Sequence, residues 1–201
     1  MSNELLNRSD DSAENNAYDA LKNTADKVMQ GLEKILDHKE INCRRWVWEL
    51  VQNAKDLDNP HGGVSIKITR EHSRLVFAHN GDPFFTWNVT ALINQVSHKP
   101  SDSVDLEITG KYGTGFISTH LLNTRITVKK VVPRQGRPAK RMSLLLDRTG
   151  TRSEDLIPKI KAAQQLVEHI DEDPAFTDIE DYEGRRTEGG FRHGVHLSAG
   201  G

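Results

Sequence analysis

The sequence predicts an α/β (α+β) two-layer sandwich, in which a mixed, mostly antiparallel sheet carries helices on one face. Two patterns indicate it. In several short segments apolar residues alternate with polar ones, which is typical of half-buried strands. In longer segments apolar residues recur at helical spacings, as on the buried side of a helix. The length agrees, because 201 residues suffice for one sizeable core.

The first part of the chain predicts two helices followed by two strands. Residues 1–16 are rich in Asn, Ser, Asp and Glu, so we expect a flexible lead-in. A helical pattern then runs to about residue 37, and a second helix is expected over 41–57. Alternating residues predict strands over 64–69 and 74–79, joined by a short turn.

The second part predicts further helices and strands around a glycine-rich loop. A short helix over 89–96 precedes a polar segment, 97–105, which contains a proline and is a candidate mobile flap. The later elements are a helix at 116–122, strands at 125–132 and 140–147, and a helix at 154–169. Beyond about residue 170 there is no clear period, and no element is predicted.

The composition excludes several functional classes. Lys and Arg number 27 against 29 Asp and Glu, which gives no electrostatic argument for a nucleic-acid partner. No apolar segment approaches membrane-spanning length and no signal-peptide pattern is present, so we expect a cytoplasmic protein without a membrane partner. The single cysteine, Cys43, fits a reducing compartment and is expected to be a small core residue. Trp46, Trp48 and Trp87 are expected to be packing residues.

The predicted helix 41–57 carries an unusual polar face. Its members follow the spacing i, i+3, i+4 and i+7 and are Glu49, Gln52, Asn53 and Asp56. An apolar stripe lies opposite them and comprises Trp46, Leu50, Ala54 and Leu57. A solvated face more often carries several Glu–Lys pairs. The alternative is that this face only meets solvent, with Glu49 in a surface ion pair with Arg45.

The second candidate motif is the glycine pattern Gly110-x-x-Gly113-x-Gly115 before a predicted helix. Glycines let backbone N–H groups approach an anion, and a helix N-terminus favours negative charge. Lys111 could add a positive charge. An ordinary glycine-rich loop is the alternative, and the pattern is neither a Walker loop nor a convincing dinucleotide fingerprint.

A phosphate at that loop would need Mg²⁺, which prefers oxygen ligands. Asn53 offers a neutral amide oxygen. Glu49, one helical turn earlier, is placed to orient and deprotonate a water that attacks the terminal phosphate. A carboxylate near a polyphosphate should have a raised pKa, which would make it a better base.

Three motifs occur in a fixed order: Glu49-x3-Asn53-x2-Asp56, His79-Asn80-Gly81, and the segment Gly110 to Phe116. Together they resemble the GHKL ATPases, the superfamily of DNA gyrase, the large heat-shock chaperones, histidine kinases and mismatch-repair ATPases. The chaperone and sacsin branch is the most similar. The resemblance covers roughly residues 42–122 and implies a Bergerat fold with ATP and Mg²⁺ as ligands.

The resemblance also implies roles for individual residues. Glu49 would be the general base, Asn53 would hold Mg²⁺ through ATP, and Gln95 would join the contacts from the lid. The nucleotide-binding candidates are Asn53, Asp56, His79, Gly81, Asp82, Phe84, Asn94, Lys99, Lys111, Tyr112, Gly113, Thr114, Gly115 and Phe116.

One departure from the family concerns base recognition. The family places Asp where His79 stands, and that Asp accepts a hydrogen bond from the adenine amine. A neutral His has one acceptor nitrogen, provided that a neighbour fixes its tautomer. Asp82 or a water is another candidate acceptor, and Phe84 would give the base an aromatic wall. A plain strand-end histidine is the alternative.

The resemblance divides the chain into a lead-in at 1–16, a GHKL-type nucleotide-binding core at 17–150 with a lid at about 85–112, and a helical extension with a poorly defined tail at 151–201. The family's last motif, a Gly-Thr near a late strand, is not identifiable, so we expect either a truncated domain end or non-native terminal residues. His193 and His196 lie in that tail without a third ligand, and no metal site is predicted.

The expected function is Mg²⁺-dependent ATP binding with slow hydrolysis, in which closure of the lid gates a conformational or partner-binding change. The alternative is a catalytically silent module that senses nucleotide or mediates an interaction. A histidine kinase is disfavoured, because no dimerisation helix with a suitable histidine precedes Glu49. Expected partners besides ATP are a second copy of the chain or downstream domains of a longer protein.

Overall fold

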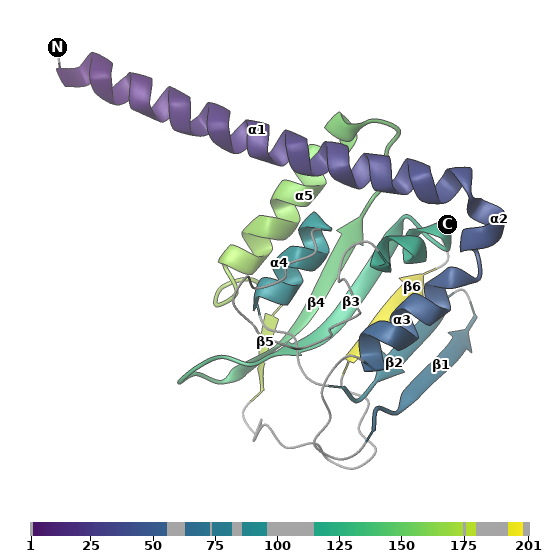
Figure 1. Ribbon diagram of the computed structural model, residues 1–201. Helices are drawn as coiled ribbons and strands as arrows, with labels where there is room; N and C mark the ends of the chain where they lie inside the picture. Colours follow the sequence, from purple (N-terminus) through teal and green to yellow (C-terminus); the bar gives the residue numbers. More distant parts are fainter. Residues whose placement is uncertain are drawn as a thin grey trace, which may run out of the picture.

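The computed structural model describes residues 2–55, 63–72, 74–81, 86–95, 115–174, 176–179 and 193–198 (Figure 1). For residues 2–11 and 193–198 it describes the backbone. The helices are α1 (Ser2–Asp37), α2 (Lys39–Asn42), α3 (Arg45–Lys55), α4 (Thr86–Asn94), the 3-10 helix η1 (Phe116–Leu121) and α5 (Ser153–Glu168). The strands are β1 (Ile66–Glu71), β2 (Arg74–His79), β3 (Arg125–Val132), β4 (Ala139–Asp147), β5 (Phe176–Ile179) and β6 (His193–Ser198).

The strands form one six-stranded sheet in the order β1-β2-β6-β3-β4-β5. Every strand pair in the described part of the chain is antiparallel. The helices form a second layer on one face of this sheet (Figure 1). The predicted α+β class and the predominance of antiparallel pairing are confirmed, whereas the mixed character is not observed among these pairs.

The last strand, β6, lies in the interior of the sheet. It pairs with β2 on one side, where Val195 faces Phe77, and with β3 on the other, where it faces Val128. Beyond residue 150, α5 packs in the helix layer and β5 and β6 belong to the same sheet as the earlier strands. The composition of the tail hid β6, since Gly194 and the polar residues around it weaken the alternating pattern.

The core lies between the sheet and the helix layer. Along β4 the buried residues alternate with exposed ones, so one face of the strand is covered and the other is open. The helices bury an apolar stripe on that covered face. The buried stripes comprise Ala25, Val28, Met29 and Leu32 of α1, Leu50 and Ala54 of α3, and Leu156, Ile160, Ala163 and Val167 of α5.

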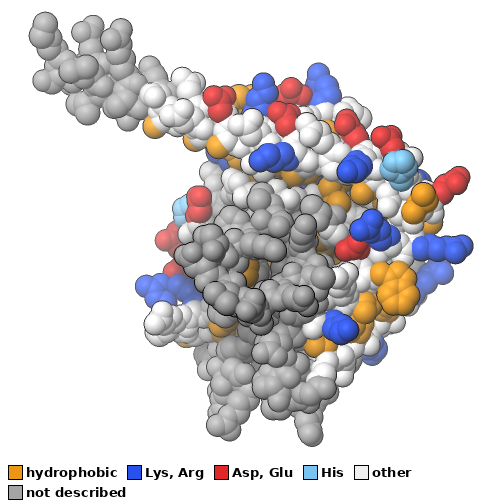
Figure 2. Space-filling view, in the orientation of Figure 1, with side chains coloured by type: hydrophobic (Ala, Val, Ile, Leu, Met, Phe, Trp, Pro, Cys, Tyr) orange, Lys and Arg blue, Asp and Glu red, His pale blue; other side chains and the backbone are white. Residues whose placement is uncertain are grey.

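Helix α1 differs from its prediction at its beginning. The lead-in 1–16 was expected to lack regular structure, but α1 starts at Ser2. A helix that is anchored by buried residues can propagate into a polar segment at low cost, because each further residue adds one backbone hydrogen bond, and no Pro or Gly interrupts residues 2–16. Along α1, charged side chains of both signs face solvent (Figure 2).

The second predicted helix, 41–57, is interrupted near its start. Residues 39–42 form the short helix α2, and α3 begins only at Arg45. The Asn42 side chain donates to the carbonyl oxygen of Ile35, 3.1 Å away, and so bonds one of the free carbonyls near the end of α1. The bond holds α2 against α1, and α3 leaves in a new direction (Figure 1).

Of the four residues expected to pack in the interior, the three exposed ones are Cys43, Trp48 and Trp87. Cys43 is exposed and its Sγ lies 3.1 Å from the carbonyl oxygen of Glu40. Trp48 is 70% exposed and Trp87 is 48% exposed, while Trp46 packs against the core as expected. The reason is helical phase, since Trp48 lies two residues from both Trp46 and Leu50 and so points away from the buried stripe.

A buried polar pair lies at the end of η1. His120 packs edge-on against Phe116, with ring centroids 6.4 Å apart. Burial, and then the charge of Arg148, lower the pKa of His120 to about 3. Backbone groups of Asn123 and Thr124 raise that pKa slightly, but within the described residues neither ring nitrogen has a partner in hydrogen-bond geometry. The imidazole is therefore neutral in the fold.

Arg148 is the second member of this pair. Its Nη2 donates to the carbonyl oxygen of Ile93, 2.5 Å away, which ties the end of β4 to α4. Burial lowers the pKa of Arg148 to about 10, while the carboxylate of Asp147 raises it. The guanidinium stays charged at neutral pH and opposes protonation of His120. Among the described helices, none is both long enough and apolar enough to cross a membrane.

Candidate functional site

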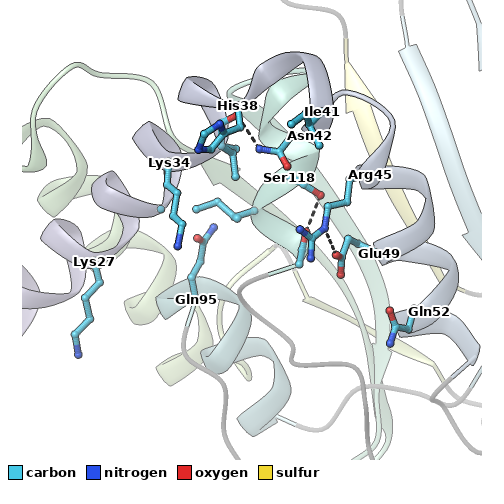
Figure 3. Close-up of a pocket in the computed structure, with 14 residues that line it drawn as sticks. Lys27, Lys34, His38, Ile41, Asn42, Arg45, Glu49, Gln52, Gln95 and Ser118 are labelled. Atoms are coloured by element: carbon cyan, nitrogen blue, oxygen red, sulfur yellow. Dashed lines mark hydrogen bonds and ion pairs between the residues drawn. The ribbon is translucent and has the colours of Figure 1, made fainter.

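A cavity of about 830 Å³ lies between α1, α2, α3 and the beginning of η1 (Figure 3). Most of its lining side chains are polar. The lining residues are Lys27, Gly31, Lys34, Ile35, His38, Ile41, Asn42, Arg45, Glu49, Gln52, Gln95, Gly115, Ile117 and Ser118. It thus joins the predicted acidic helix face to the end of the predicted glycine loop.

Glu49 and Gly115 approach each other closely in this cavity. A Cβ atom on Gly115 would lie 2.0 Å from Oε2 of Glu49, which is far inside van der Waals contact. The backbone at Gly115 is right-handed helical, with φ −78° and ψ −41°, so its glycine is required by space rather than by a left-handed conformation. The two motifs that the sequence singled out therefore meet at this point.

Glu49 also makes the ion pair that was the alternative interpretation. Its Oε1 accepts a hydrogen bond from Nε of Arg45 at 2.7 Å (Figure 3). The Arg45 side chain is 64% exposed, and exposed pairs at this helical spacing stabilise a fold by only about 0.3–0.5 kcal/mol. A stronger anion in the cavity could therefore draw Arg45 away from Glu49.

The remaining residues of the acidic face separate. Gln52 lines the cavity, whereas Asn53 is half-buried and does not line it. The predicted Mg²⁺ ligand thus lies on the same helix as Glu49, on a neighbouring part of its surface. Asp56, the last predicted member of the face, lies outside the described residues.

His79 is buried at the end of β2, and its environment fixes its tautomer. Nδ1 accepts the backbone N–H of Gly81 at 3.1 Å, so the neutral ring carries its proton on Nε2. That nitrogen lies 2.5 Å from Nζ of Lys130. Burial lowers the pKa of Lys130 well below its usual value, and a neutral amine can accept the Nε2 proton.

Both ring nitrogens of His79 are therefore engaged inside the protein. Gly81 is a neighbour of the kind that base recognition by His79 would need to fix its tautomer. In this arrangement, however, neither nitrogen remains to accept a hydrogen bond from an adenine amine. His79 fits the alternative interpretation, a strand-end histidine, better than direct base recognition.

Two lid-side residues point in different directions at the end of α4. Oδ1 of Asn94 accepts from Nε2 of Gln164 at 2.8 Å, so this side chain binds α5 rather than the cavity. Gln95 instead points into the cavity (Figure 3). Its backbone is left-handed, with φ +51°, and its buried Nε2 has no partner among the described residues.

Helix α1 contributes lining residues that no sequence pattern predicted. Lys27, Gly31 and Lys34 follow the spacing i, i+4 and i+7, which places them on one side of the helix, and His38 follows directly after its end. That spacing was visible in the sequence. The spacing alone did not predict a binding site, because a row of Lys residues on a helix is usually a solvated face.

Of the remaining predicted site residues, Phe116 is described by the structure and eight others lie outside the described part of the chain. Phe116 is buried in the core, and its side chain contacts His120 rather than the cavity. The predicted residues outside the described part of the chain are Asp56, Asp82, Phe84, Lys99, Lys111, Tyr112, Gly113 and Thr114. The predicted flap 97–105 also lies outside it. The described residues contain no group of three His, Cys, Asp or Glu side chains that could hold a metal ion.

No protein-family model matches this chain. No curated protein matches its sequence either.

Proposed function

We propose that the protein binds ATP together with Mg²⁺ at this cavity and hydrolyses it slowly, with closure of the site gating a conformational or partner-binding change. The observation that carries the proposal is the contact between the Glu49 carboxylate and Gly115 at a cavity with several cations in its wall. In phosphoryl transfer to water, backbone N–H groups can hold the phosphates while a nearby carboxylate orients the attacking water, and Gly115 and Glu49 could take these two parts. The resemblance to the GHKL ATPases is the reason for proposing ATP as the nucleotide.

Hydrolysis would begin with the release of Glu49 from Arg45. The guanidinium of Arg45 is exposed and can pair with phosphate oxygens, which match its donor geometry better than one carboxylate oxygen does. Breaking the Arg45–Glu49 ion pair costs little free energy, because the Arg45 side chain is exposed. The freed Oε1 could then accept a proton from the water that attacks the terminal phosphorus. Gly115 leaves room for this carboxylate to move.

The donors near the cavity fit Mg²⁺ only as an ion that arrives on the phosphates. Mg²⁺ keeps several waters and uses few protein ligands at such sites. Glu49 is the one carboxylate among the described lining residues, and amide oxygens come from Asn42, Gln52 and Gln95. Asn53 could supply one oxygen after a change of side-chain rotamer. Bound Mg²⁺ would supply positive charge to the phosphates.

The alternative, a module that binds nucleotide without hydrolysing it, is favoured by two contacts. His79 uses both nitrogens inside the protein, and Glu49 is paired with Arg45. Weak recognition of the adenine ring and a general base held in an ion pair would both fit a nucleotide sensor. The two functions differ in one measurable step, the release of phosphate.

The proposal is tested by calorimetric titration of ATP with and without Mg²⁺, followed by phosphate-release assays. Glu49→Gln should bind ATP normally and release no phosphate. Asn53→Ala should lose the part of the affinity that depends on Mg²⁺. Glu40→Gln, an exposed carboxylate outside the cavity, is the matched control and should behave as wild type.

ATP binding and phosphate release together distinguish the ATPase from the silent module. If wild-type protein binds ATP and no phosphate appears, the silent module is correct. If Glu49→Gln hydrolyses ATP at the wild-type rate, Glu49 is not the base. If no nucleotide binds at millimolar concentration, the whole proposal is wrong.

A further inference from the structure

The cavity carries a local excess of positive charge. Lys27, Lys34 and Arg45 line it against a single carboxylate among the described lining residues, Glu49, which is already paired. The whole chain, by contrast, has a net charge of −2. The described lining residues thus carry a net positive charge although the chain does not, and an anion is the ligand that this wall would attract.

An uncommitted donor points at the same space. Gln95 and Lys34 point toward each other across the cavity (Figure 3). A buried amide donor costs free energy unless it finds an acceptor, and Nε2 of Gln95 has none in the described part of the chain. The left-handed backbone of Gln95 is an unusual conformation that holds its side chain in this position.

The wall that carries the lysines is held rigidly. A Cβ on Gly31 would lie 2.6 Å from Cδ1 of Ile117, so α1 and η1 pack more closely than a larger residue would allow. Val28 and Leu32, on the neighbouring side of α1, are buried in the core. Lys27 and Lys34 therefore extend from a fixed helix, while their own chains remain exposed to solvent.

We propose that the α1 wall of this cavity is a subsite for the polyphosphate chain of the ligand, in which Lys27, Lys34 and Gln95 contact the phosphate oxygens. A linear polyphosphate offers several charged acceptors in a row, which matches donors from separate elements. The inference rests on the proposed function where the polyphosphate belongs to ATP. Free inorganic polyphosphate has the same chemistry, and the test separates the two sources.

The experiment is calorimetric titration of the full chain with inorganic tripolyphosphate, ATP and AMP, each with Mg²⁺. The test variant is Lys27→Gln with Lys34→Gln, and the control is Lys22→Gln with Lys39→Gln, which removes two exposed lysines outside the cavity. An exposed charge pair at contact changes affinity about fivefold, so loss of two should weaken tripolyphosphate and ATP about 30-fold. The control should change both affinities less than about threefold, since its exposed charges do not line the cavity and are screened by solvent and salt.

A second variant, Gln95→Met, tests the geometry rather than the net charge. It should weaken both ligands about tenfold, because one hydrogen bond to a charged acceptor is lost. Equal melting temperatures for all variants show that any loss comes from the site.

The outcomes separate the two proposals. If ATP binds wild type and the double variant equally, the subsite is wrong and the nucleotide function stands. If tripolyphosphate binds through the lysines and ATP binds no better, the subsite stands and its ligand is free polyphosphate. If tripolyphosphate fails to bind wild type, or the control loses as much affinity as the test variant, the subsite is wrong.

Discussion

Acidification should destabilise this protein through His120. The pKa of this buried imidazole falls from 6.5 in the unfolded chain to about 3 in the fold, chiefly because burial disfavours the charged ring. Between these pH values the unfolded chain binds a proton that the folded chain does not. The free energy of unfolding therefore rises with pH in this window and is lost as the pH falls.

The size of the effect follows from the same two values. Each pH unit below 6.5 should remove about 1.4 kcal/mol of stability, so the loss reaches about 3 kcal/mol at pH 4.5 and about 5 kcal/mol at pH 3. That is a large share of the 5–15 kcal/mol by which folded domains are usually stable. Urea unfolding at pH 7.5, 6.5, 5.5 and 4.5, followed by circular dichroism, measures it.

Replacement of the ring isolates its contribution from that of other titrating groups. His120→Leu keeps an apolar side chain of similar size against Phe116 and removes the proton-binding site. The free energy of unfolding of this variant should fall about 3 kcal/mol less than that of wild type between pH 6.5 and 4.5. His169→Leu removes an exposed histidine of α5 and should follow wild type. Parallel curves for wild type and His120→Leu would refute the reasoning.

Three further predictions concern the site and the sheet. Gly115→Ala should displace the Glu49 carboxylate, because the added Cβ would occupy its place. The end of the Glu49 side chain is flexible, so the melting temperature should change little while the rate of phosphate release falls at least tenfold. An unchanged rate of phosphate release would contradict the contact. Between pH 7 and pH 10 the melting temperature of wild type should rise relative to that of Lys130→Met, because burial lowers the pKa of Lys130 and the unfolded chain binds its proton up to about pH 10.5; the exposed neighbour Lys129→Met is the control and should show no such change relative to wild type. Val195→Pro should cost about 3 kcal/mol or more in urea unfolding, since it removes a backbone donor inside the sheet, and a loss below about 1 kcal/mol would argue against an interior β6.

Several elements of the fold could be predicted from sequence because their patterns are local. Strand β2 has the predicted bounds, and β3, β4 and α5 differ from theirs by one residue at most at either end. Their apolar residues alternate or recur clearly, so burial and sequence period agree. Strand β6 was missed because it is stabilised by pairing on both sides, a non-local effect that a glycine-containing segment does not reveal.

The candidate site was predicted less completely, for a physical reason. Glu49 and Gly115 could be singled out, because their motifs restrict chemistry within a few residues. Gln95 was named only through the family resemblance, and its side chain reaches the cavity from the left-handed turn after α4. The lysines of α1 were not predicted, because they enter the site only through the packing of α1 on η1. The pairing of His79 with Lys130 joins residues 51 positions apart, and no local pattern predicts it.

The place of β6 has a consequence for synthesis in the cell. The hairpin β1–β2 and the strands β3, β4 and β5 join only through this strand in the described sheet, so during synthesis both keep an unpaired edge until residues 193–198 have emerged from the ribosome. Completion of the sheet must then follow the emergence of β6 from the exit tunnel. Nascent chains with two waiting edges are prone to associate with one another, and slow or crowded translation should lower the soluble yield more than the stability of the finished fold would suggest.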